Sequence, residues 1–310
     1  MLIGDTGLSP RDRTTLQAEY PRLRCVDVGP IQALERGFSE ARNRVLDAAT
    51  GEWFCWVDTD EVLVGHEQLH KYLEGGVFVG YALKQHHLML DVPKTFDTPM
   101  RVFRRVPTIR FYGCIHEQPQ MGDANGDITP SLQLHDVEIA HVLGYLTEAI
   151  RRQKCLTRNL PLLVRDQQMF PDRRLGKLLV LRDLVNLGTW AREAAGGALT
   201  DDAKRYYQQA IGLFEQHFVD PSDKHYALAR PFYEAALQPV DGAWEAEIAF
   251  AARQGGLGKG RAKSERVWVR TREDLAALVA HRAQTWVPTV EPPIDVEPVG
   301  GVALPQEAVA

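Results

Sequence analysis

The chain has 310 residues, 45% of them hydrophobic and 25% charged, so it is long enough to form one full-sized globular core and a second, smaller lobe. Its formal net charge of −5 argues against a general binder of nucleic acids or of anionic membrane surfaces. The longest apolar runs fall well short of the ~18 residues that a membrane-spanning helix needs, and we expect no transmembrane segment.

The cysteine pattern predicts a reduced, cytoplasmic protein. None of the cysteines belongs to a CxxC pair, and no signal peptide precedes them. We expect them to be reduced packing residues, because disulfides are rare in the cytosol. The four positions are Cys25, Cys55, Cys114 and Cys155.

Residues 1–120 alternate short apolar runs with polar periodic segments, a pattern typical of α/β domains. The first expected strand contains Leu2 and Ile3 and runs into a turn. A short helix is expected over 9–20, because Ser-Pro is a common helix start, and a strand over 24–28.

The second expected helix covers residues 38–49, with Ser39 as its N-cap. An apolar, aromatic-rich strand over 53–57 follows it. Further strands are expected within 76–90 and 99–118, where aromatic and β-branched residues are bounded by Pro or Gly.

Acidic residues follow the strand over 53–57 directly: Asp58-Thr59-Asp60-Glu61. Ligands of open α/β sheets bind at the carboxyl ends of strands, which is where these carboxylates are expected. Carboxylates packed together repel one another unless a cation neutralises them, and Asp58 and Asp60 are suited to share a divalent ion with a phosphate. The alternative interpretation is a solvated acidic turn.

The periodicity becomes helical from about residue 143 and stays so to about 253. Successive helices of this length are similar to a short tetratricopeptide-like array, although no strict 34-residue repeat aligns. The expected helices cover 145–164, 173–195, 201–218, 223–237 and 243–253.

We therefore predict three parts of the chain. Residues 1–140 form an α/β lobe, and residues 141–255 form an all-α helical lobe. Residues 256–310 comprise the end of a flexible basic linker, a short strand and helix, and a disordered Pro-rich tail.

A family resemblance rests on the segment from Ser39 to Glu61. It contains Ala41-Arg42-Asn43, then Gly51-Glu52, then the apolar strand and Asp58-Thr59-Asp60-Glu61. This order and spacing resembles the central A-R-N, G-E, D-x-D-E signature of family 2 glycosyltransferases of the GT-A fold. The resemblance spans roughly residues 1 to 220.

Other segments match the same family in the expected order. Asp5-Thr6-Gly7 resembles its D-x-G-S-x-D turn, with Leu8 in place of the usual Ser. Residues 111–117 resemble its G-x-x-H-E segment, and 158–160 its R-N-L element. His141 resembles the start of an H-x-G-Y element, which is one residue longer here. Family members carry one more strand and helix ahead of the position of the first residue, so we expect the first strand to be missing.

The resemblance implies a GT-A lobe, Rossmann-like with a mixed sheet, that binds a nucleotide-sugar and is followed by an all-α lobe. It implies a metal-dependent glycosyltransferase of the hexosyltransferase type, which moves a sugar from a nucleotide-diphosphate donor to an acceptor hydroxyl, with inversion. The implied cofactor is Mn²⁺ or Mg²⁺, which stabilises the charge on the leaving diphosphate. The acceptor is a protein, a lipid-linked sugar or another glycan, and an oligomer is compatible with the sequence.

The resemblance also assigns roles to residues. Asp5, Arg42, Asn43 and Asp58 would bind the donor, and Asp58 and Asp60 would ligate the metal. His141, or His116 in its place, would complete the metal shell. Glu117 would be the base that takes the acceptor proton, with Glu61 as its rival.

Plainer interpretations remain open for most of these residues. Arg42 and Asn43 could be exposed polar residues of a helix. His116 and Glu117 could be a hydrogen-bonded pair that shapes a loop, and His141 a packed core residue.

Two other functions remain open. A haloacid-dehalogenase-type phosphatase is compatible with residues 58–63, which fit a D-x-D-x-[TV]-[LV] nucleophile motif, and with residues 122–127, which imitate that family's late acidic element. A catalytically inactive binding or scaffold module is compatible with the expected loss of the first strand and with the helical lobe.

Overall fold

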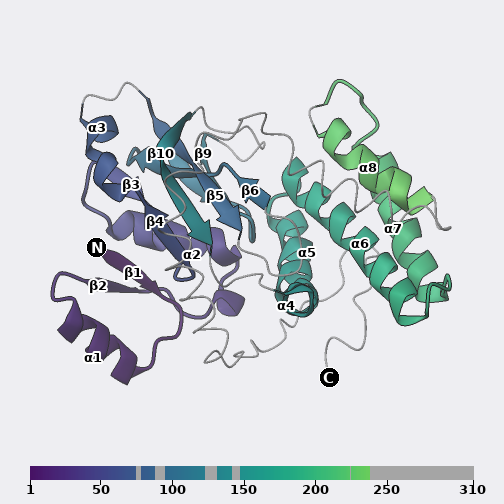
Figure 1. Ribbon diagram of the computed structural model, residues 1–310, viewed down its shortest axis with the longest axis horizontal. Coiled ribbons are helices and arrows are strands. Elements are labelled where there is room, and N and C mark those ends of the chain that lie inside the picture. Colours follow the sequence, from purple (N-terminus) through teal and green to yellow (C-terminus); the bar gives the residue numbers. More distant parts are fainter. Residues whose placement is uncertain (75–77, 88–94, 123–130, 142–146, 224, 238–310) are drawn as a thin grey trace.

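Two lobes follow one another along the chain: a curled mixed sheet with its helices, and then a group of packed helices (Figure 1). The computed structural model describes residues 1–74, 78–87, 95–122, 131–141, 147–223 and 225–237. The expected helix over 243–253 and the predicted part 256–310 lie outside the described residues. This arrangement confirms the expected α/β class followed by a helical lobe.

The chain begins with a small parallel sheet. Strand β1 (Leu2–Asp5) pairs with β2 (Arg24–Asp27), and helix α1 (Pro10–Glu19) connects them. The Oγ of Ser9 accepts a hydrogen bond from the amide of Asp12 at 3.1 Å, so α1 begins where the Ser-Pro pair predicts.

Helix α2 (Gly37–Ala48) begins earlier than expected. Ser39 lies in its first turn, where its Oγ donates to the carbonyl of Arg36 at 2.9 Å, so the prediction of Ser39 as N-cap was wrong. The start is set by a distant loop, because the amide of Phe38 donates to the carbonyl of Cys114 at 2.9 Å. A Cβ on Gly37, which has a φ of 54°, would overlap that carbonyl.

The main sheet is mixed. In order across the sheet the strands are β3 (Trp53–Cys55), β7 (Met100–Arg104), β5 (Gly80–His87), β10 (Leu132–His141) and β4 (Glu61–Val64). Strand β5 is parallel to β10, and the other three neighbouring pairs are antiparallel. A short strand, β6 (Thr95–Asp97), pairs with the end of β5.

Aromatic side chains fill the space between α2 and this sheet. Phe54 and Phe103 lie 5.4 Å apart between ring centroids, and Phe111 meets Trp56 edge-on at 5.6 Å. Burying each ring contributes about 1.5–3 kcal/mol. Phe111 belongs to a separate hairpin of β8 (Ile109–Tyr112) and β9 (Gln118–Met121). Residues 113–117 form the loop that connects these two strands.

The described part of the helical lobe, within residues 147–237, confirms the predicted succession of helices, but the first one differs from the prediction. The helix expected over 145–164 is divided by a π-helical turn over Cys155–Asn159 into α4 (Glu148–Lys154) and α5 (Leu160–Met169). Among the described residues, no helix has both the length and the apolar character to cross a membrane. The helices are α4 (Glu148–Lys154), α5 (Leu160–Met169), α6 (Arg174–Ala194), α7 (Asp201–His217) and α8 (Tyr226–Leu237).

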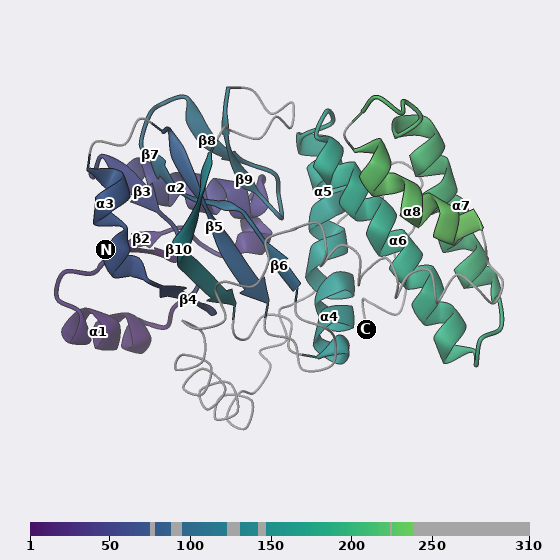
Figure 2. The same cartoon turned by 45° about the horizontal axis from the view of Figure 1, so that its top comes forward.

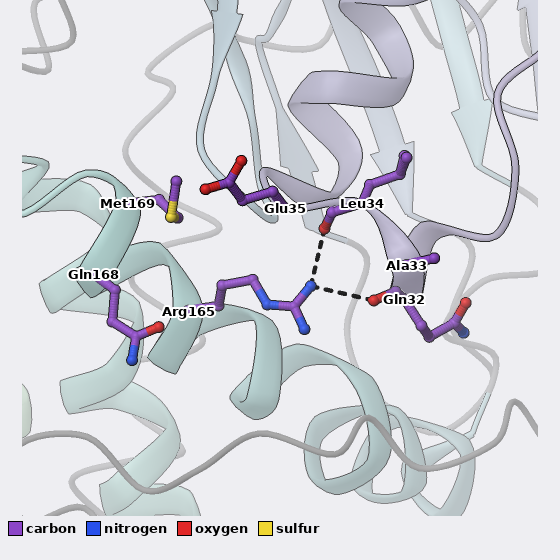
Figure 3. Close-up of a pocket in the computed structure, with 7 residues that line it drawn as sticks. All are labelled: Gln32, Ala33, Leu34, Glu35, Arg165, Gln168 and Met169. Atoms are coloured by element: carbon purple, nitrogen blue, oxygen red, sulfur yellow. Dashed lines mark hydrogen bonds between the residues drawn. The ribbon is translucent and has the colours of Figure 1, made fainter.

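Helices α4 and α5 lie between the sheet and the α6–α7 pair in both views (Figures 1 and 2). The guanidinium of Arg165 on α5 donates to the carbonyls of Gln32 and Leu34 at 3.3 and 2.9 Å, beside a hollow of about 280 Å³ (Figure 3). The ring of Tyr112 also meets Phe170 edge-on at 6.3 Å. The two lobes therefore share a packed junction.

Candidate functional site

Asp58 and Asp60 occupy the loop between β3 and β4, and Glu61 is the first residue of β4. The loop closes on itself, because the amide of Glu61 donates to the carbonyl of Asp58 at 3.0 Å and the amide of Asp58 donates to Glu61 Oε2 at 2.8 Å. The side chains of Asp58 and Asp60 are 40% and 31% exposed. Both carboxylates can therefore meet a ligand from solvent.

Arg42 joins this loop to the segment that contains Glu117. Its Nη2 donates to Asp58 Oδ1 at 2.7 Å, and its Nε donates to Glu117 Oε1. Its guanidinium lies 4.0 Å from the ring centroid of Trp56. The side chain of Arg42 is 17% exposed, so the interpretation of Arg42 as an exposed helix residue was wrong.

Electrostatics favour the charged forms of Asp58 and Arg42. Burial is the largest influence on the pKa of Asp58 and raises it, but the charges of Arg42 and Arg101 hold that pKa below its ordinary value. Burial likewise lowers the pKa of Arg42, and Glu117 and Asp58 together outweigh it and raise that pKa. The arrangement is thus a cation held between two carboxylates.

Glu61, the rival base, lies in a buried network. Its Oε1 accepts from Arg101 Nη2 and from Gln85 Nε2, both at 2.6 Å, and its side chain is 1% exposed. Arg101 also lies over Trp56, 3.6 Å from the ring centroid. These bonds fix the Glu61 carboxylate, whose other oxygen accepts from the amide of Asp58 in the acidic loop.

Arg101 was missed by the sequence analysis as a site residue. The sequence feature that could have identified Arg101 is its place within a strand of large apolar side chains, Met100–Arg104. A cation buried in such a strand needs an anionic partner, and that partner could have been sought among the nearby carboxylates. Gln85 gave no comparable signal.

His141 contacts Asp60 and a second histidine. Its Nε2 lies 3.0 Å from Asp60 Oδ2, and its Nδ1 lies 3.1 Å from His87 Nδ1. His87 Nε2 in turn lies 3.0 Å from Asp97 Oδ2. The sheet explains the chain of contacts, because the register pairs His141 with His87 on β5 and with Glu61 on β4.

His141 also lowers the pKa of Asp60, its carboxylate partner. Burial raises the pKa of Asp60, but the hydrogen bond and charge of His141 outweigh it and hold that pKa below its ordinary value. Neither His87 nor Asp97 was predicted as a site residue. Only the pairing of β5 with β10 and β6 brings them to this place.

The described residues do not by themselves form a complete metal site. Among the described residues, no group of three or more His, Cys, Asp or Glu side chains is arranged to hold a metal. Mg²⁺, however, is commonly bound by one or two carboxylates together with substrate phosphates and water. Asp58 and Asp60, two positions apart in the sequence and partly exposed, provide that number of carboxylates.

Two of the expected donor-binding residues form hydrogen bonds that hold the fold together. Asp5 Oδ1 accepts from the amides of Gly7 and Leu8 at 3.0 and 2.7 Å, and Arg13 pairs with Asp5 Oδ2. Asn43 exchanges two hydrogen bonds of 3.0 Å with the backbone of Phe111. Asp5 therefore holds its own turn, and Asn43 holds β8 against α2.

His116 occupies a left-handed conformation, with a φ of 49°. Burial and the charges of Arg182 and Arg173 lower the pKa of His116 to about 3. Its imidazole is therefore neutral, and within the described part of the chain its Nε2 has no hydrogen-bond partner. His116 forms the turn from which Glu117 reaches Arg42.

Comparison with known proteins shows a similarity to a repeat-containing protein. No protein-family model matches the chain. A TPR repeat-containing protein of Synechococcus elongatus is 27% identical over 284 residues, which covers 79% of this chain and 68% of that protein. Because residues 141–310 make up little more than half of the chain, the match extends into the sheet lobe.

Proposed function

We propose that the chain is a metal-dependent glycosyltransferase whose sheet lobe has the GT-A fold. It would transfer a sugar from a nucleotide-diphosphate donor to an acceptor hydroxyl, with inversion. The observation that carries this proposal is the contact of Arg42 with both Asp58 and Glu117. The family resemblance assigns these three residues to one site, and although they are far apart in the sequence their side chains are in contact.

The acidic loop would face the donor diphosphate. Asp58 and Asp60 are the side chains that would hold Mn²⁺ or Mg²⁺, and the bound ion would neutralise the charge that develops on the departing diphosphate. Arg42 adds a fixed positive charge beside Asp58. A cation preorganised in a partly buried site stabilises such charge more strongly than one in water.

Glu117 would take the proton of the acceptor. The acceptor oxygen would attack the anomeric carbon as its O–H proton moves to Glu117, and the bond from that carbon to the diphosphate oxygen would break on the opposite side. The ion pair with Arg42 orients the Glu117 carboxylate toward the acidic loop. Glu61 is less suited to this role, because its side chain is 1% exposed and accepts from both Arg101 and Gln85, whereas that of Glu117 is 6% exposed and pairs with Arg42.

A second candidate is a binding module that recruits a protein through its helical lobe. The helical hairpin of α6 and α7 and the similarity to a TPR repeat-containing protein favour it. The two candidates are compatible, since the helical lobe of a transferase can hold an acceptor protein.

The test is release of nucleoside diphosphate from a panel of nucleotide-sugars, measured with Mn²⁺ or Mg²⁺ and with EDTA. We expect metal-dependent release in the wild type, strong loss in Asp60→Asn and Glu117→Gln, and no change in the exposed control Glu67→Gln. Turnover of aryl phosphate with an aspartyl-phosphate trapped at Asp58 would support the phosphatase instead. No activity in either assay, with capture of a defined partner by the helical lobe, would support the binding module.

A further inference from the structure

The loop that carries Glu117 is embedded in the helical lobe. Cys114 and Ile115 are 0% and 4% exposed, and they belong to the same buried cluster as Leu160 and Leu163 of α5. The candidate base therefore follows directly on a segment whose side chains pack among helices, although the strands on either side belong to the sheet lobe.

A buried ion pair of the helical lobe holds the backbone of this loop. Asp166 on α5 and Arg173, which precedes α6, are each 1% exposed, and Arg173 Nη1 lies 2.9 Å from both carboxylate oxygens of Asp166. Asp166 Oδ1 also accepts from the amide of Cys114 at 2.6 Å. Arg173 donates to the carbonyl of Ile115 at 3.2 Å and to that of His116 at 2.5 Å.

The loop is shaped to admit this pair. Gly113 has a φ of 107°, and a Cβ at this position would overlap the guanidinium of Arg173. A Cβ on Gly176 of α6 would likewise overlap the carboxylate of Asp166. A buried ion pair is costly unless further hydrogen bonds satisfy it. The peptide groups of the loop supply such bonds to Asp166 and to both Nη atoms of Arg173, whereas Arg173 Nε has no hydrogen-bond partner among the described residues.

The same loop also touches the helix that bears Arg42. The carbonyl of Cys114 accepts from the amide of Phe38 in the first turn of α2. The left-handed conformation of His116 persists only where its surroundings hold it, and Arg173 holds the carbonyl of that residue. Glu117, the next residue, is then directed at Arg42.

We propose that Asp166 and Arg173 are positioning residues that set Glu117 against Arg42, so that the helical lobe is part of the catalytic unit. The inference rests on the proposed function for the role of Glu117. A base held in one place lowers the rearrangement needed to reach the transition state. Loosening the loop should therefore slow the chemical step while donor binding at Asp58 and Asp60 is kept.

The test uses the full chain with Arg173→Lys, Arg173→Met and Asp166→Asn. Lysine keeps the charge but cannot bridge two carbonyls and a carboxylate as the guanidinium does. The matched control is Arg174→Met, because Arg174 is the next residue, forms an ion pair with Asp223, and lies over Phe218.

The first readout is amide hydrogen exchange, which does not depend on activity. In Arg173→Lys and Asp166→Asn we expect exchange of residues 114–118 to rise about tenfold, while α7 stays protected. Arg174→Met should leave the loop unchanged. Equal protection of the loop in wild type and in folded Arg173→Lys would overturn the inference.

The second readout is steady-state turnover of the nucleotide-sugar identified by the panel. We expect Arg173→Lys to lower kcat by about 10²-fold and to change the donor KM by less than about 3-fold, as expected when a reacting group is misplaced. The double variant Arg173→Lys/Glu117→Gln should be no slower than Glu117→Gln. If the kcat of the double variant were lowered by the product of the two single-variant factors, the inference would be overturned, because Arg173 would then act independently of Glu117.

The two proposals fail separately. If Arg173→Met unfolds, Arg173→Lys and Asp166→Asn still report on the loop. If the wild type turns over no donor, the proposed function fails. The role of the pair in holding residues 114–118 is then decided by hydrogen exchange alone.

Discussion

Arg42 on α2 and Glu117 after β8 form an ion pair across 75 positions of sequence. Arg42 also donates to Asp58, and the indole of Trp56 supports its guanidinium. This one side chain joins the helix before the acidic loop to the loop that carries the candidate base.

Removing Arg42 should destabilise the protein. In Arg42→Met, Asp58 and Glu117 are left close together without their cation, and we expect the free energy of unfolding to fall by about 3 kcal/mol. Urea denaturation measures this change. Arg44→Met is the control on the same helix, because Arg44 is 47% exposed, pairs with Glu40 at the surface and donates to the carbonyl of Val28, so its loss should cost about 1 kcal/mol. Equal losses in the two variants would contradict the central role of Arg42.

His116 should make stability depend on pH. Its pKa is lowered to about 3 in the folded protein, against about 6.5 in the unfolded chain. Between these values the unfolded chain binds a proton that the folded protein does not, so stability should fall as the pH falls, by up to about 1.4 kcal/mol per pH unit.

Urea denaturation at several pH values with EDTA present tests this dependence. His116→Asn should flatten the slope between about pH 6 and pH 4, because asparagine cannot be protonated there and tolerates the left-handed backbone. His135→Asn, on an exposed position of β10, is the control and should keep the wild-type slope. An unchanged slope in His116→Asn would show that other groups cause the pH dependence.

The acidic loop should bind metal mainly together with a nucleotide. Two carboxylates are too few to hold Mn²⁺ firmly, whereas diphosphate oxygens complete its shell. We expect thermal-shift experiments to show stabilisation by a nucleoside diphosphate with Mn²⁺, equivalent to about 2.7 kcal/mol at 100 times the Kd. Mn²⁺ alone should have a much smaller effect, and Asp60→Asn should remove the response. The same shift with Mn²⁺ alone would indicate a complete protein site.

Two glycine substitutions should have opposite effects. Gly113→Ala forces a Cβ into the guanidinium of Arg173 at a φ of 107°, and it should lower the free energy of unfolding by about 1–3 kcal/mol. Gly212 lies within α7 and faces open space, so Gly212→Ala should raise that free energy by about 0.5–1 kcal/mol. Thermal or urea denaturation measures both, and a neutral Gly113→Ala would contradict the close packing of the loop.

Local features were predictable wherever neighbouring residues decide them. Ser9 caps α1 because the amide it bonds lies three residues along the chain. The acidic loop follows its strand, although that strand ends at Cys55 and not at Val57 as expected. The helices of the second lobe follow from apolar periodicity, which records the face that each helix buries.

Contacts between distant segments were not predictable in the same way. Ser39 has the chemistry of an N-cap, but a carbonyl from Cys114 determines where α2 begins. His87 and Asp97 meet His141 only through the register of the sheet. The role of Asp166 and Arg173 depends on how the lobes dock, and nothing near either residue in the sequence indicates it.

The sequence by itself determined the succession of an α/β lobe and a helical lobe, and the position of Asp58 and Asp60 in the loop that follows β3. These depend on residue periodicity and on neighbours along the chain. The tertiary structure decided that Arg42 lies between Asp58 and Glu117, and that a buried ion pair of the helical lobe holds the loop of Glu117. Such contacts depend on strand register and lobe packing, which many weak and distant interactions fix together.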